Sequence, residues 1–102
     1  MNSTDDSDLI GRFKKGDPSA FEVIVRKHQD RVYNLCRYML RDPEDAQDAA
    51  QDVFLKSFRG LKDFSPHSSL YTWIYRIATN LAIDELRYRK RRGRVFHRNL
   101  RA

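Results

Sequence analysis

Three acids in this chain have a spacing that suits a metal site. Asp45, Asp48 and Asp52 stand at i, i+3 and i+7, so a helix would bring their carboxylates to one face. Mg²⁺ and Ca²⁺ need oxygen ligands that converge from several segments or from a loop that wraps around the ion, and one convex helical face supplies neither. We therefore predict no metal ion and no cofactor at these acids.

The residue types that most often catalyse reactions are scattered. His28, His67 and His97 are far apart in the sequence, and the chain has no Gly-rich phosphate loop, HExxH or CxxC motif. We predict that the protein is not an enzyme and has no catalytic residue. Cys36 and His28 lie in an apolar helical pattern, which favours a buried thiol and a hydrogen-bonded histidine at the edge of a core.

Positive charge is concentrated at the end of the sequence. Residues 87–102 contain eight Arg or Lys and no acid, whereas residues 1–86 hold the other 12 bases and all 14 acids. This asymmetry indicates a polyanionic partner near the C-terminal end and a different partner elsewhere, although a solvated tail beyond Gly93 is an open alternative. The chain has no apolar run of roughly 18 residues and its first residues are polar, so we expect no membrane partner and a cytoplasmic location.

Two motifs of the same form mark helix starts. Asp17-Pro18 and Asp42-Pro43 each place a capping carboxylate before a proline at the first helical position, and Gly16 is suited to end the preceding helix. The sequence predicts helices at about 7–15, from Pro18 onward, at 43–61 and at 70–89, with a loop at 62–69. We predict an all-α fold, a compact bundle of four helices over residues 1–92, with a basic C-terminal tail.

Apolar residues recur at steps of three and four in the last three helices and define their expected inner faces. These positions are Phe21, Ile24, Val25, His28, Val32, Leu35, Cys36 and Met39; then Ala46, Ala49, Ala50, Val53, Phe54, Ser57, Phe58 and Leu61; then Leu70, Trp73, Ile74, Ile77, Ala78, Leu81 and Leu86. The outer face of the third helix is acidic first and basic later. That order either complements the helix dipole or forms a docking surface, and both explanations stay open.

The order of motifs resembles that of bacterial extracytoplasmic-function (ECF) sigma factors. The resemblance is carried by DPEDAQDAAQDVFLKSFRGLKDF at 42–64, by SLYTWIYRIATNLAIDELR at 69–87 and by the opening helices, and it covers about residues 9–92. It implies that residues 1–92 have the sigma factor region 2 fold, bind core RNA polymerase, and recognise and melt the −10 promoter element to initiate transcription. We expect residues 93–102 to begin a basic interdomain linker and the helix-turn-helix region 4 to be absent.

The resemblance implies two interfaces. The first would bind the β′ clamp helices of the polymerase through Asp45, Asp48, Gln51, Asp52 and Phe58, although Phe58 also belongs to the expected inner face. The second would bind the non-template strand of the −10 element through Phe64, Ser68, Ser69, Tyr71, Tyr75, Arg76, Asn80 and Arg87.

Within the second interface the residue types imply different roles. The loop residues and Tyr71 would hold an extruded base, Asn80 would read a base edge, and Arg76, Arg87, Arg89 and Lys90 would contact phosphates. Trp73 is either a core residue or a contact near the melting point, and Tyr75 is either an interface residue or ordinary surface. The base preference is open, because Ser65-Pro66-His67 stands where the family has a basic residue and a glycine.

Two other functions are compatible with the sequence. A helix-turn-helix repressor would bind duplex DNA without any polymerase. A protein-interaction domain would have an anti-sigma factor as its main partner, and many members of the resembled family are held inactive in that way.

Overall fold

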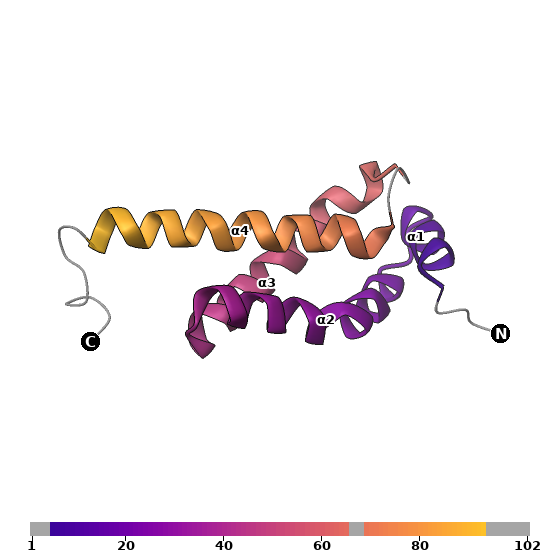
Figure 1. Cartoon of the computed structure of the whole chain (residues 1–102). Coiled ribbons are helices and arrows are strands. Elements are labelled where there is room, and N and C mark those ends of the chain that lie inside the picture. Colours follow the sequence, from indigo (N-terminus) through magenta and orange to yellow (C-terminus); the bar gives the residue numbers. More distant parts are fainter. Residues whose placement is uncertain (1–4, 66–68, 94–102) are drawn as a thin grey trace.

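The computed structural model describes residues 5–65 and 69–93, and within these ranges all regular secondary structure is helical. Its elements are α1 (Asp6–Lys14), α2 (Ser19–Leu40), α3 (Pro43–Gly60), the short 3₁₀ helix η1 (Leu61–Asp63) and α4 (Leu70–Gly93). Figure 1 shows α2 and α4 lying alongside each other, with α3 crossing behind them and α1 beside the first turns of α2 and α4. The predicted all-α, four-helix architecture is confirmed.

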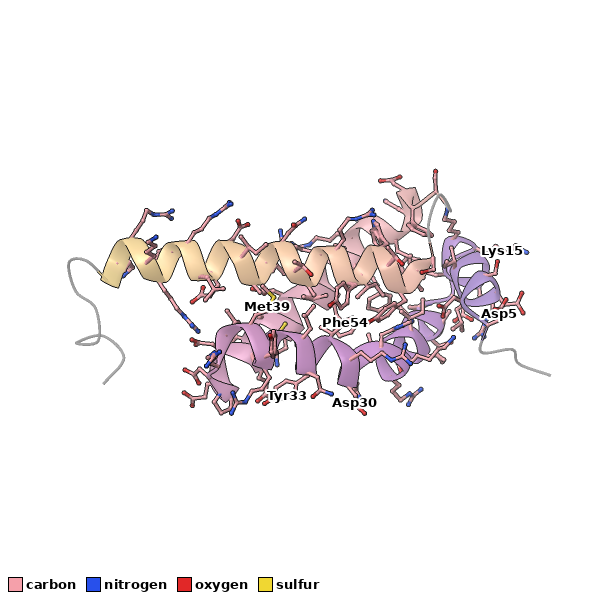
Figure 2. The ribbon with its side chains drawn as sticks, viewed as in Figure 1. Asp5, Lys15, Asp30, Tyr33, Met39 and Phe54 are labelled. Carbon is pink, nitrogen blue, oxygen red and sulfur yellow. The ribbon has the colours of Figure 1, made fainter. Side chains whose placement is uncertain are left out.

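All four helices contribute to one hydrophobic core. Figure 2 shows Met39 and Phe54 among the helices, whereas Asp30 and Tyr33 point away from α4. The buried apolar residues are Leu9, Ala20, Phe21, Ile24, Val32, Cys36, Leu40, Ala46, Val53, Leu61, Phe64, Leu70, Ile74, Ala78 and Ala82. Most of the expected inner positions are therefore buried or packed against this core.

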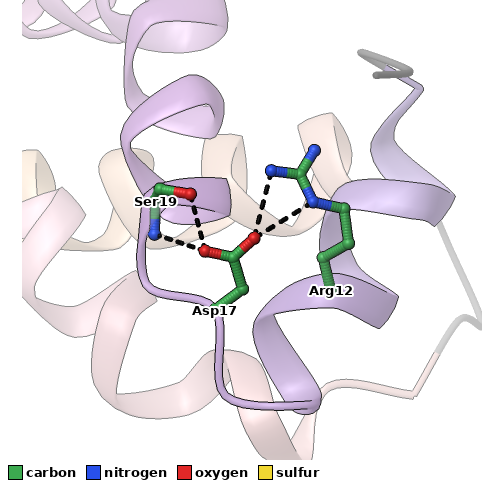
Figure 3. Close-up of polar contacts among 3 residues, drawn as sticks. All are labelled: Arg12, Asp17 and Ser19. Atoms are coloured by element: carbon green, nitrogen blue, oxygen red, sulfur yellow. Dashed lines mark hydrogen bonds and ion pairs between the residues drawn. The ribbon is translucent and has the colours of Figure 1, made fainter. Parts of the chain in front are cut away.

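The two capping carboxylates act where the sequence places them. Asp42 Oδ1 accepts a hydrogen bond from the Glu44 N–H at 3.0 Å. Asp17 Oδ1 accepts from the N–H and the hydroxyl of Ser19, at 3.0 and 2.6 Å, while its Oδ2 accepts from Arg12 Nη2 at 3.1 Å (Figure 3). These hydrogen bonds from Ser19 and Arg12 lower the pKa of Asp17 and hold the corner between α1 and α2.

Two positions expected on the inner faces are exposed. Phe58 is 46% exposed, because the adjacent Ser57 occupies the side of α3 that faces the core. Leu86 is 36% exposed, because the buried Ala82 and the Arg89 side chain take the inward side of α4 near its end. Helical periodicity assigns a residue only approximately to one face of its helix. The packing of the other helices determines which of two adjacent residues is buried.

Helix α4 is longer than the sequence analysis predicts. It continues past Arg89 to Gly93, because Arg and Lys are good helix formers and no proline or capping residue stops it. Its last turn includes Arg92, whose Nη1 donates to the Tyr88 hydroxyl at 2.6 Å. Residues 90–93, which follow the predicted end of the helix, are therefore helical, and residues 94–102 lie outside the described ranges.

Candidate functional site

The outer face of α3 presents acids followed by apolar side chains. Asp48, Gln51 and Asp52 are exposed, as predicted. Leu55 and Phe58 are 52% and 46% exposed and lie on the same face, since positions 48, 51, 52, 55 and 58 follow the helical repeat. Leu55 is absent from the predicted interface. The sequence does contain a signal for it: Leu55 is a large apolar residue that lies outside the predicted inner face of α3. Such a residue does not contribute to the core and is therefore a candidate for an interface.

A groove of about 950 Å³ runs between α2 and α3 beside this face. Its lining includes Gln51, Leu55 and Phe58 of α3 together with Asp30 and Tyr33 of α2. Figure 2 places Asp30 and Tyr33 on the side of α2 away from α4, so the groove opens on that side of the molecule. An apolar floor with a polar and acidic rim suits a helical protein segment that carries basic groups.

Asp45 does not belong to the accessible acids. Its Oδ2 accepts a hydrogen bond from Arg89 Nη2, and its side chain is only 15% exposed. Arg89 Nη1 also donates to the Leu40 carbonyl at 2.8 Å, which satisfies an acceptor at the end of α2. The two side chains join α4 to the α2–α3 corner, a structural role that the sequence analysis does not predict. The docking role of Asp45 and the phosphate contact of Arg89 stay predictions.

Three predicted DNA-binding residues share the outer face of α4. Arg76, Asn80 and Arg87 are exposed and stand at i, i+4 and i+11, which brings them to one side of the helix. No residue in the described ranges forms a hydrogen bond or ion pair with these three side chains. The arrangement offers two cations and one amide to a ligand that lies along α4.

In the described part of the predicted base pocket, the ring of Phe64 is covered by the protein's own side chains. Phe64 is 6% exposed and packs against Trp73, with ring centroids 5.0 Å apart. Trp73 fits over Gly60, where a Cβ atom would lie 3.2 Å from the indole. The interpretation of Phe64 as an open stacking plane is therefore wrong, and Trp73 packs at the edge of the core. The Phe64 carbonyl accepts a hydrogen bond from Lys14 Nζ at 2.8 Å, which fixes the beginning of the loop.

Of the two predicted serines, only Ser69 lies within the described residues. Ser69 Oγ accepts a hydrogen bond from the Thr72 N–H at 3.1 Å and so caps α4. Ser68 lies outside the described residues, as do Pro66 and His67.

The two predicted tyrosines pack in a row that also includes residues of α2. Tyr71 stacks on His28, with centroids 6.0 Å apart and an interplanar angle of 21°. Its ring is 5.5 Å from that of Tyr75, and the Arg31 guanidinium lies 5.2 Å from its centroid. Tyr71 is half-buried and Tyr75 is 42% exposed, so Tyr75 has the more accessible ring.

Two buried titratable groups lie near these surfaces. Burial lowers the pKa of His28, and the Asp6 carboxylate 3.6 Å away partly offsets that effect. Neither ring nitrogen of His28 forms a hydrogen bond with a described residue, so the expected hydrogen-bonded state is not observed. Cys36 is buried, as predicted, and burial raises the pKa of its thiol.

The described ranges also bear on metal binding and on membrane insertion. Within them, no three or more His, Cys, Asp or Glu side chains gather as metal ligands would. None of the described helices is both long and apolar enough to cross a membrane.

Comparison with known protein families identifies the family of this chain. The model of sigma-70 region 2 matches residues 24–92. The chain belongs to this family. Its relatives place it among the ECF sigma factors, as the sequence resemblance predicts, and sigma factors are regulatory proteins without catalytic activity.

Three curated relatives show the extent of the similarity. The chain is 39% identical to the RNA polymerase sigma-H factor of Pseudomonas aeruginosa over 90% of its own length and 48% of that protein. It is 42% identical to the ECF sigma factor SigW of Bacillus subtilis and 40% identical to the ECF sigma-E factor of Escherichia coli K12, in both cases over 79% of this chain. The matches cover 43% and 42% of those proteins, so the chain spans about half the length of these relatives.

A solved structure supports the same fold. An engineered region 2 of sigmaE, determined by NMR in complex with GTAAAA, matches with a TM-score of 0.77 and 35% sequence identity. The match covers 90% of this chain and 97% of that one. The predicted sigma factor region 2 fold is confirmed.

Proposed function

We propose that this chain binds core RNA polymerase through α3 and the α2–α3 groove, and recognises and melts the −10 promoter element through α4. The observation that carries the proposal is the presence of two accessible surfaces of different chemistry on one helical body. The protein would make no bond itself, and its binding energy would stabilise the separated strands. A protein that works with RNA polymerase would act in the cytoplasm.

The polymerase contact is supported by the chemistry of α3. Asp48 and Asp52 are exposed carboxylates that can form charge-assisted hydrogen bonds with basic groups of the β′ clamp helices. Leu55 and Phe58 border the groove and supply apolar contact area next to these charges. If binding buries such a charge pair, truncating one of its two side chains costs about 2–5 kcal/mol of binding free energy. Much of this cost comes from the partner charge that stays buried without its counter-ion.

Reversal of one charge tests this contact. Asp52→Arg should abolish capture of core RNA polymerase by the chain in a pull-down, because an arginine would face a basic surface. Asp63→Arg makes the same charge change at an exposed position of η1 and should leave capture intact. Circular dichroism should show equal helicity in both variants. Equal capture of core polymerase by the wild type and Asp52→Arg would exclude the α3 surface.

The DNA contact is supported by the side chains on α4. Asn80 can pair with the edge of an adenine, while Arg76 and Arg87 can bind phosphates on either side. Extruding a base costs a few kcal/mol, and the exposed ring of Tyr75 offers a surface on which an unpaired base can stack. The similar sigmaE region 2 was solved with GTAAAA, which supports a related ligand here.

Removal of the α4 side chains tests the DNA contact. The double variant Arg76→Ala/Asn80→Ala should bind core polymerase normally but reduce permanganate reactivity of thymines in the −10 region. Arg26→Ala removes an exposed cation from α2 and serves as the control. Unchanged strand opening in the double variant would exclude this face. Gel shifts address the repressor alternative, since a repressor binds duplex DNA alone and this chain should prefer the unpaired non-template strand.

A further inference from the structure

We infer that Arg31 of α2 forms, with Tyr71 and Tyr75 of α4, a further nucleotide-binding site for single-stranded DNA. The inference rests on the proposed function and extends it, because it brings a residue of α2 into a DNA surface otherwise made by α4. Its ligand class is one unpaired nucleotide and its phosphate.

Arg31 contacts an aromatic ring, and it forms no ion pair with a carboxylate of the described residues. Its guanidinium lies 5.2 Å from the centroid of Tyr71. The ring of Tyr71 is itself held by stacking on the buried His28. By contrast, Lys27 of the same helix pairs with Asp6, and Arg12 of α1 pairs with Asp17.

Arg31 therefore retains hydrogen-bonding capacity for a ligand. It is exposed, and no carboxylate in the described ranges pairs with it. The neighbouring Asp30 points to the other side of α2, as Figure 2 shows. A guanidinium stacked on a ring loses little further freedom on binding, and its N–H groups match the geometry of a phosphate.

Tyr75 supplies the second half of the site. Its ring is 5.5 Å from that of Tyr71 and 42% exposed, so an accessible plane lies next to the Arg31–Tyr71 pair. A base stacked on Tyr75 would have its sugar-phosphate near the guanidinium. Bases in a duplex are covered by their neighbours, and therefore this plane selects an unpaired nucleotide.

The site also adjoins the proposed DNA face. Arg76 directly follows Tyr75, and Asn80 lies one turn farther along α4. A single strand that crosses α4 could therefore contact both sets of residues. An acidic peptide would satisfy Arg31 but would leave the ring of Tyr75 without a planar partner, so single-stranded DNA fits the pair better.

Binding of a labelled single-stranded oligonucleotide that contains GTAAAA, measured over a series of salt concentrations, tests the inference. Arg31→Gln should reduce the slope of log K against log salt by about 0.7, the value for one lost phosphate contact, which corresponds to about fivefold weaker binding near 0.1 M salt. Arg37→Gln removes the same charge from an exposed position on another face of α2 and should change neither quantity. Equal behaviour of Arg31→Gln and wild type would overturn the inference.

Variants of Tyr71 test whether the ring positions the cation. Tyr71→Phe keeps the ring and should bind as the wild type does, whereas Tyr71→Leu should weaken binding about as much as Arg31→Gln. The double variant Tyr71→Leu/Arg31→Gln should be no weaker than either single one, because both remove the same contact. Additive losses in the double variant would contradict positioning of Arg31 by the ring.

Two further measurements distinguish failure of this inference from failure of the proposed DNA face and from binding of an acidic peptide. If Asn80→Ala weakens binding while Arg31→Gln does not, the inference is wrong and the proposed DNA face stands; if neither has an effect, both are wrong. Polyglutamate that displaces the oligonucleotide from the wild type but not from Arg31→Gln would identify an acidic-peptide site instead. Thermal unfolding of each variant shows whether a loss of binding reflects loss of fold.

Discussion

His28 is enclosed where α1, α2 and α4 meet, although it is a group that titrates near neutral pH. Its side chain is 4% exposed and stacks on Tyr71 of α4, and Asp6 of α1 lies 3.6 Å from Nε2. Burial disfavours the charged imidazolium and lowers the pKa of His28 below its ordinary value of 6.5, even though Asp6 acts in the opposite direction. The folded state therefore favours the neutral ring.

This shift predicts a loss of stability on mild acidification. As pH falls below 6.5 the unfolded chain binds a proton at this histidine more readily than the folded chain does, so the free energy of unfolding decreases. Urea unfolding of the wild type between about pH 7.5 and 5.5 should show this decrease. His28→Gln should flatten the dependence over that range. An equally steep dependence in the variant would assign the effect to other groups.

Periodicity predicted which acids of α3 are accessible, but not which acid has an internal partner. Asp48 and Asp52 are exposed, as their positions on the helix require. Asp45 has a similar position in the pattern, yet it pairs with Arg89, 44 residues away in the sequence. Phe64 likewise looks available in the sequence and is covered by Trp73. Such pairings depend on how helices pack, which the local pattern does not encode.

At the scale of elements, the corner between α1 and α2 requires a glycine, whereas a glycine inside α1 can be replaced. Gly16 has φ of +101°, a backbone conformation that other L-residues rarely adopt. Gly11 lies inside α1, and a Cβ atom added there would meet nothing within 4 Å. Substitution by alanine is therefore expected to have opposite effects on stability at the two positions.

Replacement of each glycine by alanine should change stability in opposite directions. Gly16→Ala should lower the free energy of unfolding by about 1–2 kcal/mol because the left-handed conformation is strained. Gly11→Ala should raise it by about 0.5–1 kcal/mol because alanine favours the helix. Urea unfolding measures both. A stabilised Gly16→Ala variant would contradict the assigned corner geometry.

The contact between α4 and the α2–α3 corner predicts a second stability effect. Arg89→Met removes the hydrogen bonds that Arg89 donates to the Leu40 carbonyl and to the Asp45 carboxylate, and should destabilise the fold by about 2–3 kcal/mol. Asp45→Asn should cost less, and the double variant should cost less than the sum, because the two side chains share one contact. Arg87→Met, at an exposed position, should have little effect. Capture of core polymerase by folded Asp45→Asn tests the predicted docking role of Asp45, which equal capture by the variant and the wild type would exclude.

The sequence predicted where helices begin better than where they end. The capping carboxylates at 17 and 42 act locally, so their effect is visible in a few consecutive residues. The end of α4 lacks such a signal, because a run of Arg and Lys suits both a helix and a solvated tail. The additional turn of α4 follows from helix propensity and from the anchoring of Arg89 against α2.

On the scale of the whole molecule, one small core supports two surfaces that face different sides. The groove lies between α2 and α3 on the side of α2 away from α4, whereas Arg76 and Asn80 lie on α4 itself. The chain would then hold polymerase and DNA at the same time. The fold class could be predicted because amphipathic periods and caps specify helices. The α2–α3 groove and the Arg31–Tyr71 pair could not, because each joins two helices.

The most direct test asks what each surface touches in one complex. A photo-crosslinking amino acid replaces Leu55 in one variant and Asn80 in another, and each is bound to core RNA polymerase and a promoter fragment whose −10 region is already unpaired. Position 55 should crosslink to the β′ subunit and position 80 to the non-template strand. Crosslinks of both positions to the same partner, or with the partners exchanged, would contradict the assignment of the two surfaces.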